Sequence, residues 1–366
     1  MAFPQNFLDE IKNRIAVSDI VGRRVKLQRR GREYVGLSPF KQERTPSFTV
    51  NDDKQFYHCF ATGKHGSVFD FIMETEGLSF PEAVEQLARQ AGLEMPERDP
   101  QAAQRAAVQA TLIDVTEASA LWFQAQLKAP EAAEARAYLE RRGVSQELIE
   151  RFGIGYAPGA RTALIEHLSA RQMRPPQIVE AGMAIQPEES DRPPYDRFRE
   201  RIMFPIHDAR GRVIAFGGRA MSADAKAKYL NSPETPLFHK GAVLFNFARA
   251  RQPAYDANMV LVAEGYMDVV GLARAGLHHA VAPLGTAVTE DQIRLLWRLA
   301  PEPVMCLDGD EAGLRAAYRA IDRILPQLKP GFSMQFALLP AGKDPDDVVR
   351  DGGAEAMNDT IGRARS

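Results

Sequence analysis

Four short apolar segments alternate with helical patterns after residue 257, and this alternation restricts the fold more than any other feature of the chain. The segments read NMVLVAEG (258–265), HAVAPLGT (279–286), PVMCLDGD (303–310) and SMQFALLP (333–340). Short apolar strands separated by helices are typical of a parallel sheet that carries helices on its faces. We therefore predict an α/β domain in this part of the chain.

Acidic side chains follow three of these four predicted strands. They are Glu264 after the first, Asp308 and Asp310 after the third, and Asp344, Asp346 and Asp347 after the fourth. Groups beyond the carboxyl ends of parallel strands collect in one crevice. Carboxylates that share a crevice repel one another, and a hard divalent cation among them relieves that repulsion. The pattern predicts a Mg²⁺ (or Mn²⁺) site that also accepts substrate phosphates.

A structural explanation of the Asp-Gly-Asp sequence stays open. Asp310 could instead cap the helical sequence EAGLRAAYRAI that follows it, and Asp308 could form an Asx turn. Glu264, at the equivalent end of another strand, favours metal binding. Gly265 and Gly309 stand beside the acids and would let a phosphate or a metal approach the backbone closely.

Four blocks of this region resemble, in order and spacing, the Toprim domain of DnaG-type bacterial DNA primases. They are AEGYMDVV (263–270), APLGTAVT (282–289), LDGDEAG (307–313) and KDPDDVV (343–349). The resemblance implies metal ligation by Asp308, Asp310, Asp344 and Asp346. It also implies that Glu264 is a further metal ligand or a general base, with Glu264, Asp308 and Asp310 as the catalytic residues.

A basic region precedes these blocks. The predicted hairpin RIMFPIHDARGRVIAFGGRAM (201–221) carries Arg210, Arg212 and Arg219, and it is followed by KYLNSPET (228–235) and FHKG (238–241). Cations interspersed with hydroxyl and amide groups suit a surface that binds phosphates. For any single arginine, a solvated basic face is the simpler explanation.

This basic region resembles the amino-terminal half of the RNA-polymerase core of the same family. The resemblance implies that Arg219, Lys228 and Lys240 contact template or nucleotide, with Tyr229, Asn231 and Ser232 as supporting contacts.

The segment SPFKQERTPSFTVNDDKQFYHCFATGKHG (38–66) resembles the amino-terminal zinc ribbon of these primases. The four family ligand positions hold Ser38, Lys41, Cys59 and Thr62. Structural zinc needs four soft or borderline donors in a closed tetrahedron, and only Cys59 supplies one. We therefore expect that this ribbon binds no zinc.

Aromatic residues in the same segment are interleaved with cations. This pattern suits single-stranded DNA, because bases stack on rings while phosphates meet the charges. The alternative is that the rings form the core of the small domain. Strand alternation along KQFYHCF would place Phe56, His58 and Phe60 on one face and Tyr57 and Cys59 on the other.

A chain of 366 residues is too long for one ordinary core, and the predicted fold class is a mixture of α/β and α+β domains. A degenerate zinc-ribbon-like domain is expected at 1–95 and a linker at 96–111. The basic α+β subdomain is expected at 112–256 and the Toprim subdomain at 257–342, with its acidic site extending to about 347. Residues 348–366 are expected to begin a truncated helical subdomain.

The resemblance implies a DNA-directed RNA polymerase that makes short primers on single-stranded DNA from ribonucleoside triphosphates. The expected partners are a replicative helicase of the DnaB type, engaged through a carboxy-terminal domain beyond residue 366, and a single-stranded-DNA-binding protein. The sequence has no apolar run of bilayer length and two cysteines far apart, so a cytoplasmic protein is expected. The resemblance implies a place at the replication forks of the nucleoid. The alternatives are a Toprim nuclease or topoisomerase-like enzyme, and a non-catalytic DNA-binding or helicase-recruiting protein.

Overall fold

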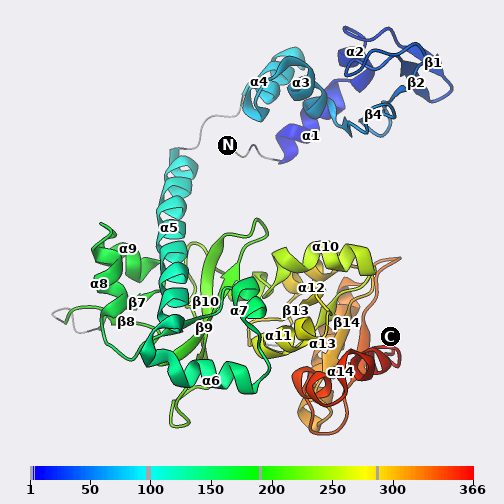
Figure 1. Cartoon of the computed structure of the whole chain (residues 1–366). Helices are drawn as coiled ribbons and strands as arrows, with labels where there is room; N and C mark the ends of the chain where they lie inside the picture. Colours follow the sequence, from blue (N-terminus) through cyan, green and yellow to red (C-terminus); the bar gives the residue numbers. More distant parts are fainter. Residues whose placement is uncertain (1–2, 4, 96–99, 189–191, 286–287) are drawn as a thin grey trace. The chain divides into compact units, whose positions relative to one another are not determined.

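The computed structural model describes all residues except 1–2, 4, 96–99, 189–191 and 286–287, and the chain divides into two compact units (Figure 1). Unit 1 is Met1–Ala103 and unit 2 is Gln104–Ser366.

Unit 1 combines four helices with a five-stranded antiparallel sheet. The strands pair in chain order, and the elements are α1 (Gln5–Arg14), α2 (Val17–Val21), β1 (Gln28–Arg30), β2 (Glu33–Gly36), β3 (Phe48–Asn51), β4 (Phe56–Cys59), β5 (His65–Gly66), α3 (Val68–Glu76) and α4 (Phe80–Gln90). Ser79 is the N-cap residue of α4, and its N–H and hydroxyl both donate to Glu82. The predicted alternation in β4 is confirmed, since Tyr57 and Cys59 are buried whereas Phe56 and Phe60 are exposed.

The first half of unit 2 is built on an antiparallel sheet of order β11-β10-β9-β6. Helix α5 (Pro100–Lys128) crosses the boundary between the units and lies mostly in this half. The other elements are α6 (Ala133–Arg141), α7 (Gln146–Phe152), β6 (Gly155–Ala157), α8 (Ala163–Ser169), α9 (Pro175–Glu180), β7 (Ala184–Ile185), β8 (Tyr195–Asp196), β9 (Arg201–His207), β10 (Val213–Ala220) and β11 (Tyr229–Asn231). The predicted hairpin is confirmed as β9 and β10. Short 3₁₀ turns lie at Pro130–Ala132, Lys240–Ala242 and Leu325–Gln327.

The predicted linker 96–111 differs from the structure over most of its length. Residues 96–99 lie outside the described residues, and α5 begins at Pro100 and continues past residue 111. A proline is favourable in the first turn of a helix, where its missing N–H has no partner to lose. The alanine- and glutamine-rich sequence that follows favours helix over linker.

The second half of unit 2 is the predicted α/β layer. Its strands are parallel throughout, in the order β13-β12-β14-β15. The elements are α10 (Phe247–Ala257), β12 (Leu261–Val262), α11 (Tyr266–Arg274), β13 (Ala280–Val281), α12 (Glu290–Trp297), β14 (Val304–Leu307), α13 (Glu311–Ile324), β15 (Gln335–Leu338) and α14 (Pro345–Ile361).

Helices cover both faces of the parallel sheet. Leu261 and Cys306 belong to a core cluster that includes residues of α11 and α14, whereas Val262 and Met305 belong to one that includes residues of α10, α12 and α13. Side chains of a strand alternate between faces, so each apolar strand serves two cores. The predicted start of a helical subdomain at 348 falls inside α14, which packs on α11 as part of this layer. Among the described helices, none is long and apolar enough to span a bilayer.

A buried histidine at the end of β9 predicts acid sensitivity of unit 2. Burial, and next the charge of Arg249, lower the pKa of His207 to about 4, and an Arg249 N–H lies 3.1 Å from its Nδ1. The unfolded-state pKa is about 6.5, so below that pH the unfolded state binds a proton that the folded state refuses. We expect the free energy of unfolding to fall by about 2 kcal/mol between pH 7 and pH 5 through this residue.

Denaturant unfolding followed by tryptophan fluorescence tests this, because both tryptophans, Trp122 and Trp297, lie in unit 2. The difference in the free energy of unfolding between pH 7 and pH 5 should become smaller in His207→Gln. It should persist in His239→Gln, because the ring of His239 is exposed. An unchanged difference in His207→Gln would contradict the assignment.

Candidate active site at the carboxyl edge of the parallel sheet

The carboxyl ends of β12 and β14 carry three of the predicted acids. Glu264 follows β12, and Asp308 and Asp310 follow β14, its parallel neighbour. Asp310 is the N-cap of α13 and accepts a hydrogen bond from the Gly313 N–H at 2.8 Å. The capping alternative for Asp310 is therefore confirmed. The cap orients the carboxylate at the edge of the sheet and uses one of its two oxygens.

Asp344 reaches the neighbourhood of these acids from the loop after β15. It is the N-cap of α14, and its carboxylate accepts a hydrogen bond from the Asp347 N–H at 2.7 Å. Gly309 makes the approach possible, because a Cβ on it would lie 2.2 Å from the Leu339 carbonyl oxygen. The space beside Gly309 is therefore filled by the protein's own backbone, at the end of β15.

Asp308 lies in an electrostatically unfavourable position. Burial raises its pKa to about 6, and the charges of Glu264, Asp344 and Asp310 add to the effect. Its Oδ1 is buried and has no hydrogen-bond partner. Burial likewise raises the pKa of Glu264, against a hydrogen bond from the Asp308 backbone. An unpartnered carboxylate among other carboxylates is a favourable position for a cation.

Asp268 is a member of the acidic group that sequence reasoning missed. It lies in the first turn of α11, nearly completely buried, and accepts a hydrogen bond from the Gly265 N–H at 2.8 Å. Burial raises its pKa well above the ordinary value, and the charges of Asp344 and Asp308 contribute. Asp268 does not directly follow a strand as the predicted acids do, although it stands in the block AEGYMDVV.

Asp346 has other partners than the sequence predicts. Its side chain is 1% exposed and forms ion pairs with Arg142 and with Arg274, the latter at 3.2 Å. Although burial alone would lower the pKa of Arg142, the charge of Asp346 outweighs it and the pKa is raised. Gly271 of α11 admits the carboxylate, since a Cβ there would lie 2.5 Å from Asp346 Oδ1. Asp346 is therefore paired with arginines in this structure, whereas the sequence predicts it as a metal ligand with the other acids. Burial nevertheless raises the pKa of Asp346, against the charges of Arg142 and Arg274.

The remaining acids fit a hard divalent cation by chemistry and charge. Oxygen donors are what Mg²⁺ and Mn²⁺ prefer, and the orphaned Asp308 oxygen needs a positive partner. Across the described residues, no three His, Cys, Asp or Glu side chains converge as a preformed metal cage. An ion here would retain waters or take substrate oxygens, as Mg²⁺ usually does. A pocket of about 320 Å³ adjoins the site, lined by Glu264, Arg319 and Gly285 among others.

The antiparallel sheet is joined to the acidic edge through Tyr266. The Tyr266 hydroxyl donates to Asn231 Oδ1 at 2.7 Å, and Asn231 Nδ2 donates to the Leu284 carbonyl at 2.9 Å. Gly217 of β10 admits the tyrosine ring, since a Cβ there would lie 2.3 Å from it. Both the oxygen and the nitrogen of the Asn231 side-chain amide are therefore hydrogen-bonded within the protein. Asn231 Nδ2 and Lys240 Nζ both lie close to Gly285.

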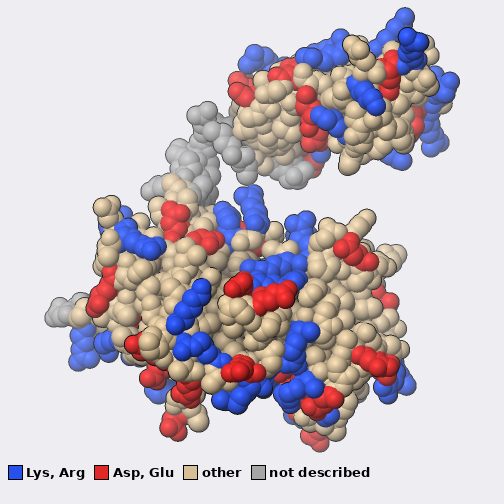
Figure 2. Space-filling view, in the orientation of Figure 1, with Lys and Arg blue, Asp and Glu red and all other residues tan. Residues whose placement is uncertain are grey.

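The other predicted template contacts fall into two groups. Lys228 and Tyr229 are exposed, and Arg219 is half-buried with its guanidinium 3.9 Å from the centre of the Tyr138 ring. Ser232 is buried and pairs with Phe216 through both its backbone and its hydroxyl. Its burial beside β10 differs from the expectation of a template contact. Figure 2 shows Lys and Arg side chains around smaller groups of Asp and Glu on the visible face of unit 2.

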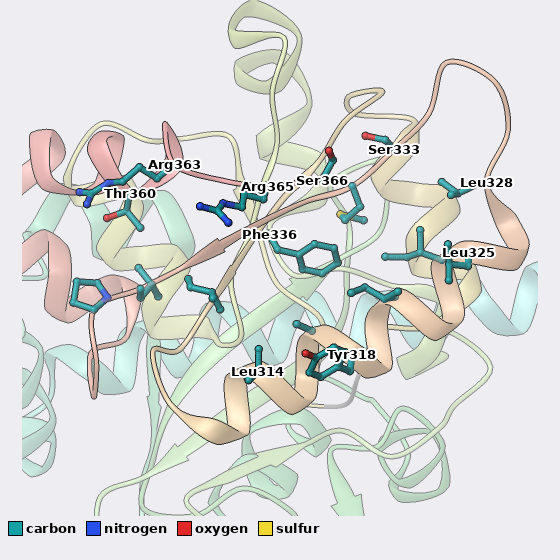
Figure 3. Close-up of a pocket in the computed structure, with 17 residues that line it drawn as sticks. Leu314, Tyr318, Leu325, Leu328, Ser333, Phe336, Thr360, Arg363, Arg365 and Ser366 are labelled. Carbon is teal, nitrogen blue, oxygen red and sulfur yellow. The ribbon is translucent and has the colours of Figure 1, made fainter.

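A larger cavity, of about 960 Å³, lies away from these acids. Leu314 and Tyr318 of α13, Phe336 of β15 and Arg365 near the end of the chain line it (Figure 3). Its walls are mostly apolar, and none of the acids of the candidate site contributes to it. Size alone would therefore select a mostly apolar hollow that holds none of the clustered carboxylates.

Comparisons with known proteins match all three parts of this chain. Family models describe residues 3–103 as a CHC2 zinc finger, 122–251 as the N-terminal domain of the DNA primase catalytic core and 261–349 as Toprim-like. The structure of a DnaG primase catalytic domain bound to single-stranded DNA is 43% identical, with a TM-score of 0.66 over 71% of this chain and 83% of that one. The chain belongs to the DnaG-type family of bacterial DNA primases.

Other primases extend the likeness to the whole chain. The DNA primase of Pseudomonas putida is 44% identical over 97% of this chain, and that of Escherichia coli K12 is 43% identical over 97%. A structure of the Aquifex aeolicus primase with its zinc-binding and RNA polymerase domains is 30% identical, with a TM-score of 0.64 over 98% of this chain and 85% of that one. The chain spans 54% and 61% of the length of the first two relatives.

The free energy of unfolding should respond with opposite sign to the same Asp→Asn substitution at two acids of this region. Asp346→Asn leaves Arg142 and Arg274 without their anion and should lower the free energy of unfolding by about 2–3 kcal/mol. Asp308→Asn removes a repelling charge whose pKa is raised. In a metal-free buffer at pH 7 it should raise that free energy by about 1 kcal/mol, after allowance for solvent screening.

Denaturant titration followed by tryptophan fluorescence measures both changes. If both substitutions lowered the free energy of unfolding by the same amount, the proposed difference between Asp346 and Asp308 would be contradicted.

Proposed function

We propose that this chain carries the primer-synthesising centre of a primase and joins ribonucleoside triphosphates into short RNA on a single-stranded DNA template. One observation supports the proposal above the others. The orphaned carboxylate of Asp308 lies among acids at the end of adjacent parallel strands. Family membership supports the reaction class, and the related DnaG catalytic domain that was solved with single-stranded DNA supports the choice of template.

Glu264, Asp308, Asp310 and Asp344 would hold the divalent ion. When bound, Mg²⁺ neutralises charge on the triphosphate and on the attacking oxygen. The caps of α13 and α14 fix the orientation of Asp310 and Asp344, so these carboxylates need no reorganisation when substrate arrives. The 3′-hydroxyl of the primer would attack the α-phosphate, with pyrophosphate as the leaving group. Glu264 would accept the hydroxyl proton or ligate the ion.

Lys228, Lys240 and Arg219 would contact the phosphates of template or nucleotide, and Tyr229 offers an exposed ring for stacking. Asn231 would act as a positioning residue, because its amide already joins Tyr266 to the Leu284 carbonyl beside the acids. A replicative helicase and a single-stranded-DNA-binding protein are the partners that this function requires. The proposal also places the protein in the cytoplasm, at replication forks of the nucleoid.

Removal of the central acids should abolish synthesis without abolishing template binding. Asp308→Ala and Asp310→Ala should each lower incorporation of labelled ribonucleotides on a single-stranded template at least 100-fold, because each deletes a carboxylate aimed at the ion. Binding of the template, measured by fluorescence anisotropy, should change less than about twofold.

Asp256→Ala is the matched control, since it removes an exposed aspartate from α10. Near-normal synthesis by both site variants would refute the proposal, and template cleavage without synthesis would favour a Toprim nuclease instead.

The contribution of the cationic residues should be visible in the salt dependence of DNA binding. Lys228→Ala should weaken binding of a single-stranded oligonucleotide and reduce the slope of log affinity against log salt by about 0.7, the loss of one phosphate contact. Lys329→Ala removes an exposed lysine near the carboxyl end of α13 and serves as the control. Equal losses in the two variants would show that Lys228 belongs only to a general basic surface.

A further inference from the structure

Three of the four zinc ligand positions of unit 1 still lie together, although only Cys59 among them keeps a zinc donor. Ser38 Oγ lies 3.1 Å from Cys59 Sγ, and Cys59 also receives hydrogen bonds from the Thr62 side chain and backbone. Cys59 is fully buried. A thiol with hydroxyl groups around it therefore occupies the place that a family model describes as part of a zinc finger.

These donors do not fit zinc. A structural site needs four thiolate, imidazole or carboxylate ligands in a tetrahedron, and hydroxyl groups are poor substitutes. His58 neighbours Cys59 in β4, and side chains of consecutive strand residues point to opposite faces. Its ring stacks with that of His65, 5.8 Å away, and also contacts Phe60. Within the described residues no three His, Cys, Asp or Glu side chains group as a metal site.

A carboxylate closes the loop that a metal would otherwise hold. Glu43 accepts hydrogen bonds from the Ser38 N–H at 2.7 Å, from the Ser47 N–H at 3.1 Å and from the Ser47 hydroxyl at 2.7 Å. One side chain thus ties both ends of the loop 38–47. The hydrogen bond from the Ser47 hydroxyl, then that from Ser38, lower the pKa of Glu43, and the charge of Lys41 acts in the same direction.

Apolar contacts anchor the same loop. Phe40 packs among Phe48, Tyr57 and Phe71, with ring centres 6.0 to 6.2 Å apart. The ammonium group of Lys64 lies 4.9 Å from the centre of the Phe40 ring, within the range of a cation–π contact. The loop is therefore fixed at its ends by Glu43 and near its start by a buried aromatic cluster.

We propose that unit 1 folds without zinc, because the Glu43 carboxylate and the hydroxyl–thiol cluster of Ser38, Cys59 and Thr62 hold the loop in the position of the lost metal site. The proposal is independent of the proposed polymerase activity. Its tests measure metal content and thiol protection, so a failure here and a failure of primer synthesis are distinguishable.

The experiment uses the full chain with Cys306→Ala, which leaves Cys59 as the single thiol. Zinc is measured by mass spectrometry after growth in zinc-supplemented medium, and less than about 0.1 zinc per chain is expected. Reaction of Cys59 with a thiol reagent then reports opening of unit 1. It should be slow, with the same rate with and without 1,10-phenanthroline. One zinc per chain, or chelator-accelerated labelling, would overturn the proposal.

Substitution of the carboxylate tests the replacement itself. Glu43→Gln should accelerate labelling of Cys59 about tenfold, because a neutral amide accepts the three hydrogen bonds less strongly. Ser47→Ala, a milder change, should accelerate it in the same direction. Glu33→Gln is the control, since Glu33 accepts from Asn51 on the exposed side of β2. Equal rates in the Glu43 and Glu33 variants would overturn the role of Glu43.

Restoration of the ligands tests whether the geometry persists. The combined substitutions Ser38→Cys, Lys41→His and Thr62→Cys supply, with Cys59, three thiolates and an imidazole. This variant should bind one zinc per chain, and phenanthroline should then accelerate its unfolding. Failure to bind zinc would show that these positions no longer surround a metal-sized space and would contradict the proposal.

Discussion

Repulsion among carboxylates at the carboxyl edge of the parallel sheet is the interaction that the rest of the site accommodates. Burial first, and then this repulsion, raise the pKa of Asp308 to about 6, and both contribute to the large rise at Asp268. Helix N-termini relieve part of it, because backbone N–H groups at the starts of α11, α13 and α14 donate to Asp268, Asp310 and Asp344. Asp308 Oδ1 has no such donor. The fold thus supplies a donor to Asp268, Asp310 and Asp344 and leaves Asp308 Oδ1 to an external cation.

Asp344 and Asp346 serve opposite purposes although they are two residues apart. Asp344 caps α14 and Asp346 lies in its first turn, and residues two apart on a helix do not face the same direction. Asp346 is consequently directed at Arg142 and Arg274. These arginines come from the end of α6 and the end of α11, and Arg274 also donates to the Arg142 carbonyl. One buried anion therefore holds α14 against both halves of unit 2.

Sequence patterns could predict the elements because each element depends on local periodicity and capping. The four parallel strands, the β9–β10 hairpin and the Ser79 cap all follow from the identity of neighbouring residues. Tertiary partners are a different matter. Nothing local distinguishes Asp346 from Asp344 as an ion-pair partner, and nothing in KYLNSPET marks Ser232 as buried against β10. Asp268 was missed because a buried carboxylate in a helix looks, in sequence, like a solvated one.

Unit 1 can fold although zinc donors are lost, because it is large enough to have a core of its own. Metals and disulfides become necessary when a domain is too small to bury enough apolar surface, below about 40 residues. Unit 1 spans 103 residues, and its core draws on α1 to α4, β3 and β4, including Ile11, Phe48 and Leu87. What a metal would add is therefore local, the closure of one loop beside β4. A carboxylate with three hydrogen bonds is sufficient for a task of that scale, since the aromatic cluster under the loop already excludes water.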